Sequence, residues 1–403
     1  MEDTINKTVG NNVVIQPERA VLAAVDTNRN SNWAIEDSLD ELCQLVATAG
    51  ATVVGRIIQK LQAPARNSYL GKGKLDELIE MKKELDYNLV IFDDELSPIQ
   101  QRSLEEALGV KVIDRVALIL DIFAKHANTR EGQLQVELAQ MQYLLPRLAG
   151  QWSHLERLGG GIGTRGPGES QLETDKRIVR TKIRNLKEHL DEVTIQRELY
   201  RERRRMRGVP VVSLVGYTNS GKSSLLNAVA RTDVLAENKL FATLDPTTRR
   251  LYINGLGNVL LTDTVGFIRK LPPAIVKAFR ATLEEINQAD LLVHVVDITA
   301  KNAFEQCQTV EKILTDMGVA DKPRLTAMNK IDLKLDTNRS WTEEEALNLL
   351  KAECPVAENT VLISAVKRWG LIELNLMLKE KLISMGFNPG YAVYDEIGEK
   401  KEQ

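Results

Sequence analysis

The chain has 403 residues, of which 43% are hydrophobic and 27% are charged, and its formal net charge at pH 7 is −3. These values are typical of a globular protein of about two or three domains and exclude a wholly disordered chain. The three cysteines, Cys43, Cys307 and Cys354, have neither pairing nor ligand spacing, which argues against a disulfide framework and against a zinc site.

No segment has the roughly 20 consecutive apolar residues that a membrane-spanning helix needs. The polar first residues, MEDTINKTVGNN, also lack the apolar core of a signal peptide. We therefore expect a soluble, cytoplasmic and monomeric protein, with residues 1–16 as a disordered tail. Because the net charge is close to zero, any contact with nucleic acid has to come from a local basic patch.

Residues 17–128 alternate short β-branched runs with segments of helical periodicity. The runs ATVVGRII and NLVIFD lie between helical segments such as SLDELCQLV and KLDELIEMKKEL. This alternation predicts βαβ units on a parallel sheet, and hence an N-terminal α/β domain. The stretch YLGKGKLDEL places two glycines and two lysines ahead of a helix, and it is a candidate for a second anion site.

Residues 129–207 predict a long helical arm. Two helical segments lie on either side of GGGIGTRGPGES, residues 159–170, and Pro146 predicts a kink in the first of them. Two helices around a glycine-rich tip favour an antiparallel hairpin.

The glycine-rich tip has three interpretations. Phosphate binding is disfavoured because no buried strand precedes the tip and no Lys-Ser or Lys-Thr pair closes it. A flexible hinge is the second, and RNA contact is the one we prefer, because residues 176–207 hold twelve Lys and Arg against five Asp and Glu. A basic helix can also be only a solvated face. The predicted RNA-contacting residues are Gly159, Gly160, Gly161, Gly163, Arg165, Gly166 and Gly168.

Residues 208–383 predict a second α/β domain, which is followed by a tail at 384–403. Its first strand runs into G-x-x-x-x-G-K-S, Gly216 to Ser223, and then into a helix. This phosphate loop points successive backbone N–H groups into one concavity. Lys222 reaches the outer phosphates, and the Ser223 hydroxyl can bind Mg²⁺.

Three further motifs follow in the order that a guanine-nucleotide switch requires. LLTDTVG ends a strand at Asp263, whose carboxylate can hold a Mg²⁺-bound water, and Gly266 can donate its N–H to a γ-phosphate. LTAMNKID supplies Asn329, Lys330 and Asp332. The Asp332 carboxylate can accept hydrogen bonds from guanine but not from adenine. VLISAV then supplies the backbone of Ser364 and Ala365 for the guanine carbonyl oxygen.

Between the first two of these elements lies NKLFATLDPTTRR, which must contain the loop that closes over the γ-phosphate and Mg²⁺. It offers Thr243, Thr247 and Thr248. Physical reasoning alone does not choose among them.

The chain resembles the HflX family of the Obg–HflX group of TRAFAC-class GTPases. The resemblance rests on GGGIGTRGPGESQLETDKR, GYTNSGKSS, FATLDPTTR, DTVGFIRKLP and NKID. It implies an N-terminal α/β domain with a helical arm, followed by a Ras-like P-loop GTPase domain, and it places Thr243 at the Mg²⁺ position. It also implies binding to the large ribosomal subunit through its RNA, and dissociation of stalled or idle ribosomes under stress.

The predicted GTP- and GDP-binding residues come from the motifs and from this resemblance. They are Gly216, Tyr217, Thr218, Asn219, Ser220, Gly221, Lys222, Ser223, Ser224, Phe241, Ala242, Thr243, Leu244, Asp245, Asp263, Thr264, Val265, Gly266, Asn329, Lys330, Asp332, Ser364, Ala365 and Val366. The predicted Mg²⁺ residues are Ser223, Thr243 and, through water, Asp263.

The chain departs from familiar patterns at two places. About twenty residues follow the last predicted helix, where many family members carry a small additional domain, so contacts made by that domain are in doubt. Phe267 occupies the position at which Ras-type enzymes use glutamine to orient water, which predicts slow hydrolysis that the ribosome stimulates. Lys222 and Asn219 remain as charge stabilisers, because Asn219 resembles a K⁺-coordinating residue; a local loop hydrogen bond is the alternative.

Two other functions compete with a ribosome-dissociating GTPase. A P-loop enzyme that transfers phosphate to a small acceptor needs an acceptor pocket and a catalytic acid or base, and the sequence identifies neither. An RNA- or ribosome-binding module that GTP gates without splitting, in assembly or hibernation, predicts the same ribosome binding.

Overall fold

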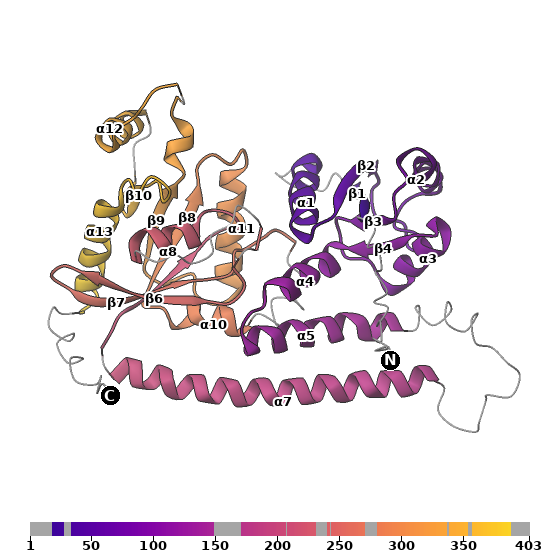
Figure 1. Cartoon of the computed structure of the whole chain (residues 1–403), viewed down its shortest axis with the longest axis horizontal. Helices are drawn as coiled ribbons and strands as arrows, with labels where there is room; N and C mark the ends of the chain where they lie inside the picture. Colours follow the sequence, from indigo (N-terminus) through magenta and orange to yellow (C-terminus); the bar gives the residue numbers. More distant parts are fainter. Residues whose placement is uncertain are drawn as a thin grey trace, which may run out of the picture.

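The computed structural model describes residues 18–27, 34–148, 171–206, 208–230, 240–241, 243–270, 280–336, 338–353 and 357–387. The N-terminal tail, the glycine-rich tip with Arg165, Ala242, Cys354 and the last sixteen residues lie outside them. Two α/β units and one long helix make up the described chain (Figure 1). None of the described helices combines the length and the apolar character that crossing a bilayer requires.

The first unit is a parallel sheet of four strands in the order β2-β1-β3-β4, as the alternating pattern predicts. All four residues of β3 are buried, which explains why LVIF is a continuous apolar run. The strands are β1 (Arg19–Asp26), β2 (Thr52–Lys60), β3 (Leu89–Phe92) and β4 (Lys111–Asp114), and the helices between them are α1 (Ile35–Ala49), α2 (Lys72–Leu85) and α3 (Pro98–Leu108).

The helix α4 (Arg115–His126) packs on α1 in the first unit. The arm is built from α5 (Arg130–Leu144), the 3₁₀ turn η1 (Leu145–Arg147) and α7 (Gln171–Met206). Pro146 lies in η1, so the α-helix ends there and continues as a 3₁₀ turn. The helices α5 and α7 lie side by side (Figure 1), and Lys182 of α7 forms an ion pair of 2.6 Å with Glu137 of α5.

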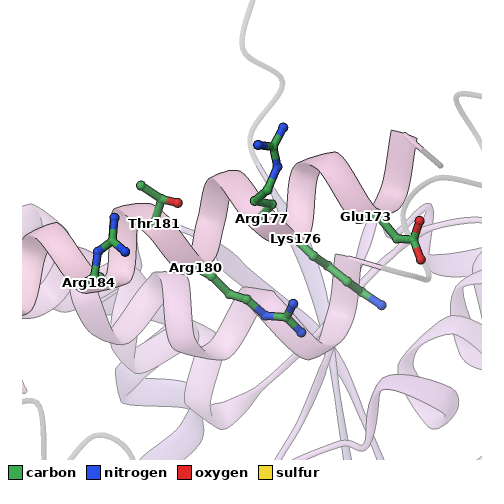
Figure 2. A pocket seen from close by; sticks show the side chains of 6 residues that line it. All are labelled: Glu173, Lys176, Arg177, Arg180, Thr181 and Arg184. Carbon is green, nitrogen blue, oxygen red and sulfur yellow. The ribbon is translucent and has the colours of Figure 1, made fainter. Parts of the chain in front are cut away.

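A basic groove of about 470 Å³ lies along the first half of α7 (Figure 2). Positions 176, 180 and 184 share one helix face because they are four residues apart. Three of the residues at this groove carry a guanidinium group and one an ammonium group. The lining residues are Glu173, Lys176, Arg177, Arg180, Thr181 and Arg184.

The second unit is a six-stranded sheet in the order β10-β9-β8-β5-β7-β6, in which only β6 is antiparallel to its neighbour among the described strands. Its strands are β5 (Val211–Val215), β6 (Thr247–Ile253), β7 (Gly257–Asp263), β8 (Leu291–Asp297), β9 (Arg324–Asn329) and β10 (Thr360–Leu362). Its helices are α8 (Lys222–Ala230), α10 (Arg280–Gln288), α11 (Ala303–Asp316), η2 (Ile331–Lys334), α12 (Glu343–Glu353) and α13 (Leu371–Ser384). The domain limits drawn from the sequence stay a prediction.

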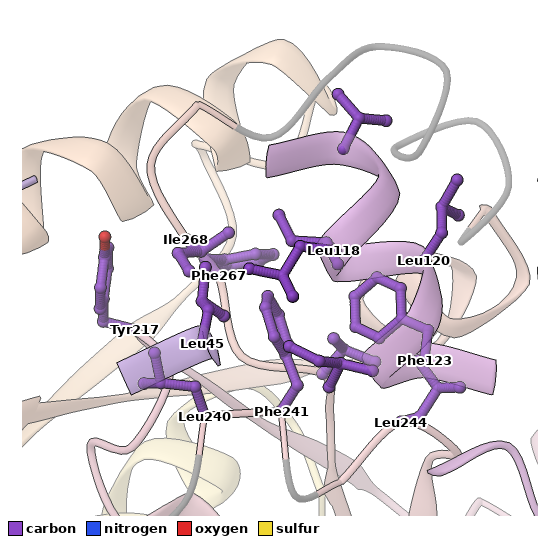
Figure 3. Close-up of a cluster of buried hydrophobic side chains, with 14 of the residues drawn as sticks. Leu45, Leu118, Leu120, Phe123, Tyr217, Leu240, Phe241, Leu244, Phe267 and Ile268 are labelled. Atoms are coloured by element: carbon purple, nitrogen blue, oxygen red, sulfur yellow. The ribbon is translucent and has the colours of Figure 1, made fainter. Parts of the chain in front are cut away.

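One buried apolar cluster crosses from the first unit to the second (Figure 3). The ring of Phe123 in α4 meets the ring of Phe241 edge to face, with centroids 4.7 Å apart and planes at 73°. Leu240, Leu244 and Phe267 are buried in the same cluster. The segments that flank the phosphate loop therefore pack on the N-terminal unit as part of one core.

A buried chain of charges lies beside this cluster. The guanidinium of Arg115, at the first turn of α4, is 99% hidden from water, and this burial lowers its pKa to about 10. It forms an ion pair with Glu41 and a second one, of 2.8 Å, with Asp93. Asp93 also accepts a hydrogen bond of 2.7 Å from the Ser38 hydroxyl. Arg115 is therefore a buried cation that pairs with two buried carboxylates.

We predict that Arg115→Ala lowers the free energy of unfolding by about 3 to 5 kcal/mol, because two carboxylates then lose their buried partner. The matched control is Arg102→Ala, whose 2.8 Å pair with Glu106 is exposed and should cost less than about 1 kcal/mol. Urea unfolding followed by circular dichroism measures both. Equal effects of the two substitutions would contradict the structural importance of the buried chain.

Candidate nucleotide-binding site

The phosphate loop, Gly216 to Ser223, joins β5 to α8 and requires its glycines for space. At Gly216, where φ is 154°, a Cβ atom would lie 2.3 Å from the backbone oxygen of Val295. At Gly221, with φ of 95°, a Cβ atom would lie 2.2 Å from Nδ2 of Asn329. Both contacts are far shorter than van der Waals distance, so the loop can close in this way only with glycine at these positions.

Lys222 is folded into the loop that carries it. Its ammonium group donates hydrogen bonds to the carbonyl oxygens of Gly216, at 3.2 Å, and Tyr217, at 2.8 Å. The side chain is buried, and this burial lowers the pKa of Lys222 to about 8. A lysine with this pKa gains most from an anion nearby, since a phosphate favours its charged form.

Three oxygen-bearing side chains meet at the start of α8. The hydroxyl of Ser223 donates a 2.6 Å hydrogen bond to Oδ2 of Asp263 and lies 2.7 Å from Oγ1 of Thr243. Asp263 is completely buried, which raises its pKa, and its Oδ1 has no hydrogen-bond partner among the described residues. A buried carboxylate with an unpaired oxygen beside two hydroxyl groups fits a hard divalent cation such as Mg²⁺.

The structure distinguishes the three threonines that the sequence left open. Thr243 lies at this oxygen cluster, whereas Thr247 and Thr248 lie on β6. The hydroxyl of Thr248 is 2.9 Å from that of Thr262 on the neighbouring strand β7. Of the three, Thr243 is the one placed to contact a metal bound at Ser223.

Asn329 connects the segment predicted to bind the base with the phosphate loop. Its Nδ2 donates to the carbonyl oxygen of Ser220 at 2.9 Å, and its Oδ1 accepts from the N–H of Ala365 at 3.0 Å. Lys330 adopts a left-handed φ of 68° and pairs with Asp297 at 2.7 Å. Asp332 is the second residue of the 3₁₀ turn η2 and is partly exposed, so its carboxylate is accessible to a base. The motif residues of three strands therefore meet at one edge of the sheet.

The segment after Asp263 is paired directly with the phosphate loop. The N–H of Phe267 donates to the carbonyl oxygen of Gly216 at 3.0 Å, and the N–H of Thr218 donates to that of Phe267 at 2.8 Å. A Cβ atom on Gly266 would lie 2.7 Å from Cα of Thr218, which explains the glycine there. The Phe267 ring is buried in the cluster between the two units (Figure 3). Its contribution is packing, since a phenyl ring has no group that binds water.

Contacts to the N-terminal unit were not predicted from the sequence. The Tyr217 hydroxyl donates to Glu41 of α1, although Tyr217 was grouped with the nucleotide-binding residues. Lys270 forms ion pairs of 2.5 Å with both Asp93 and Asp94 at the end of β3. Tyr217 and Lys270 lie in or next to recognisable motifs. The sequence around them does not indicate a partner more than a hundred residues away.

The side chain of Asp245 contacts the N-terminal half of the chain. Its predicted role in nucleotide binding, which rests on FATLD, stays a prediction. Its carboxylate accepts hydrogen bonds of 2.8 Å from the N–H groups of Asn128 and Thr129, ahead of α5. The structure thus connects the loop that contains Thr243 to the helical arm.

Two lesser candidates have different outcomes. At the candidate anion site ahead of α2, the N–H of Gly71 already donates to Gln59 at 2.8 Å, and Lys74 pairs with Glu77 at 2.7 Å. Asn219 lines a cavity of about 310 Å³ between the phosphate loop and α1, together with carboxylates such as Asp37. This cavity leaves the position of Asn219 open to a monovalent cation, and the candidate role stays a prediction.

Comparison with family models divides the chain into three matched segments. Residues 36–124 match a GTP-binding GTPase N-terminal model, residues 126–204 a GTP-binding GTPase middle-region model, and residues 211–330 a 50S ribosome-binding GTPase model. The three segments together cover most of the described units.

Individual proteins match over longer stretches. GTPase HflX of Caldanaerobacter subterraneus subsp. tengcongensis is 52% identical over 316 residues, which are 78% of this chain and 73% of that protein. GTPase HflX of Escherichia coli K12 is 43% identical over 365 residues, 91% of this chain and 83% of that protein. A solved GTP-binding protein of Sulfolobus solfataricus in complex with GDP is 26% identical, with a TM-score of 0.45 over 92% of this chain and all of that one.

We predict that GDP affinity depends on pH through Lys222. Below its pKa of about 8 the lysine is already charged, so affinity changes little; above it, binding must first take up a proton, and Kd rises by up to about tenfold per pH unit. Titration calorimetry between pH 6.5 and 9 measures this. Lys222→Arg is the control, because arginine stays protonated and should give a flat profile. A wild-type Kd that is constant up to pH 9 would contradict the assignment.

Proposed function

The chain belongs to the HflX family of GTPases, and we propose that it uses the GTP-bound state to bind the large ribosomal subunit and to dissociate stalled or idle ribosomes. The observation that carries the proposal is the contact between the loop of Thr243 and the helical arm. Through this contact, the loop of Thr243 is connected by way of α5 to α7, which carries the basic groove. The match of residues 211–330 to a 50S ribosome-binding GTPase model supports the choice of partner.

The basic groove on α7 supports contact with ribosomal RNA. Its Lys and Arg side chains present several cations along one stretch of helix (Figure 2), which suits the phosphates of an RNA backbone. The glycine-rich tip with Arg165 directly precedes α7 in sequence, and we propose that it contacts RNA as well.

GTP and Mg²⁺ are assigned to the edge of the second sheet. Ser223 and Thr243 would hold the ion directly and Asp263 through water, and the bound ion would neutralise charge on the β- and γ-phosphates. Lys222 would bind the same phosphates. Asn329, Asp332 and the backbone of Ala365 would hold the guanine base.

Hydrolysis by the protein alone is proposed to be slow. Phe267 is buried between the two units. Among the described residues that we assign to the site, we identify no side chain that would orient the attacking water as glutamine does in Ras-type enzymes. The ribosome is the proposed source of the missing positioning group, which in related enzymes accelerates hydrolysis by about 10³ to 10⁵-fold.

Asn219 provides a test for K⁺. If a monovalent cation binds beside the phosphates at Asn219, GTP turnover should be faster in KCl than in NaCl at equal ionic strength, because the smaller Na⁺ fits the same oxygens poorly. We expect Asn219→Ala to remove this difference. Equal turnover in the two salts would leave Asn219 with a loop hydrogen bond as its role.

Dissociation of ribosomes is tested by light scattering and sedimentation. With intact ribosomes, protein plus GTP or a non-hydrolysable analogue should convert the 70S peak into subunits, whereas protein plus GDP should not. Purified large subunits should also raise GTP turnover. Binding to ribosomes that leaves the 70S peak intact would favour the alternative, a GTP-gated module that binds without splitting.

A further inference from the structure

The carboxylate of Asp245 completes the N-terminal cap of a helix in the other half of the chain. It accepts hydrogen bonds from the N–H groups of Asn128 and Thr129, both 2.8 Å long, and one of 2.5 Å from the Thr129 hydroxyl. The same hydroxyl accepts from the N–H of Gly132 at 3.0 Å and is the N-cap of α5. An anion at this end of a helix of fifteen residues is favoured by the helix dipole.

The first turn of α5 is shaped to admit this carboxylate. A Cβ atom on Gly132 would lie 2.2 Å from Oδ1 of Asp245, so even alanine would displace it. Glycine in the first turn of a helix lowers helix stability relative to alanine. The contact with Asp245 gives a physical reason for accepting that cost at Gly132.

Three consecutive residues of the loop are anchored at three different places. The hydroxyl of Thr243 lies 2.7 Å from the hydroxyl of Ser223, and Leu244 is 1% exposed in the cluster between the units. The carboxylate of Asp245 accepts a hydrogen bond at the start of α5. Two residues of chain span at most about 7 Å. A movement of Thr243 out of the metal site by more than a few ångströms therefore pulls on Asp245, and release of Asp245 loosens Thr243.

We propose that Asp245 is the positioning residue that holds Thr243 at the metal site, and that the first turn of α5 is thereby part of the γ-phosphate sensor. The inference rests on the proposed Mg²⁺ site at Ser223, Thr243 and Asp263. Coupling between two binding sites is reciprocal. A ligand that holds α5 in place therefore raises the affinity for Mg²⁺–GTP, and Mg²⁺–GTP raises the affinity for that ligand by the same factor.

The test compares GTP and GDP affinity in the full-length protein. In Mg²⁺, Asp245→Ala should weaken binding of a non-hydrolysable GTP analogue by about fivefold to thirtyfold while GDP affinity stays within about twofold, since only the γ-phosphate state uses Thr243. Calorimetry measures both constants. A purely structural role of Asp245 would lower both affinities together and would leave their ratio unchanged.

Gly132→Ala should disrupt the same contact between Asp245 and α5 by a change in the helix. It keeps Asp245 and favours the helix, so it should fold, yet it should lower the ratio of GTP to GDP affinity as Asp245→Ala does. The double variant should be no worse than Asp245→Ala, because both changes remove one contact. Gly73→Ala is the matched control: it is also in the first turn of a helix, α2, and its Cβ would have no atom within 4 Å.

The inference is overturned if Asp245→Ala and Gly132→Ala keep the wild-type ratio, or if their effects simply add. Ribosomes are absent from these assays, so a failure here is distinguishable from a failure of ribosome splitting. Thr243→Ala tests whether the metal site itself is assigned correctly. If Thr243→Ala does not reduce the preference for Mg²⁺–GTP, the metal site itself is misassigned, and the inference falls with it.

Discussion

Ion pairs between buried or partly buried charged groups join the two halves of the chain. Asp93 is fully buried, and its cationic partners are Arg115 from the N-terminal unit and Lys270 from the GTPase. The pKa of Asp93 is raised by burial, and Lys270 opposes this rise. Removal of the Lys270 side chain would leave that buried carboxylate with Arg115 as its remaining ion-pair partner among the described residues. The two units are therefore connected through this carboxylate.

Two segments next to the phosphate loop, residues 243–245 and 263–270, each contact the N-terminal half through one charged side chain. The two side chains have opposite charges. Asp245 of the first segment binds N–H groups at the start of α5, and Lys270 of the second binds carboxylates at the end of β3. Between these anchors lies an apolar cluster that includes Phe241 and Phe267 (Figure 3). Close-packed clusters resist gradual deformation, so a change at the γ-phosphate is expected to move these segments between discrete positions.

The motifs of the nucleotide site could be predicted because each follows a strand of a parallel sheet, and such strand ends meet at one edge. Hence the order of Lys222, Asp263 and Asn329 in the sequence was enough to group them, and the structure places the strands that lead to them in one sheet. The parallel sheet of the N-terminal unit could be predicted from its alternating apolar runs for the same reason. Contacts such as Tyr217 with Glu41 could not, because a hydroxyl or a carboxylate shows no preference for a distant partner in a single sequence.

The central claim is that the γ-phosphate is sensed at the first turn of α5, and hydrogen exchange of the amides of Asn128, Thr129 and Gly132 tests it most directly. In the structure these amides donate to Asp245 or to Thr129, whose hydroxyl binds Asp245. They should exchange more slowly in protein loaded with Mg²⁺ and a non-hydrolysable GTP analogue than in protein loaded with GDP. Equal exchange rates in the two nucleotide states would contradict the account.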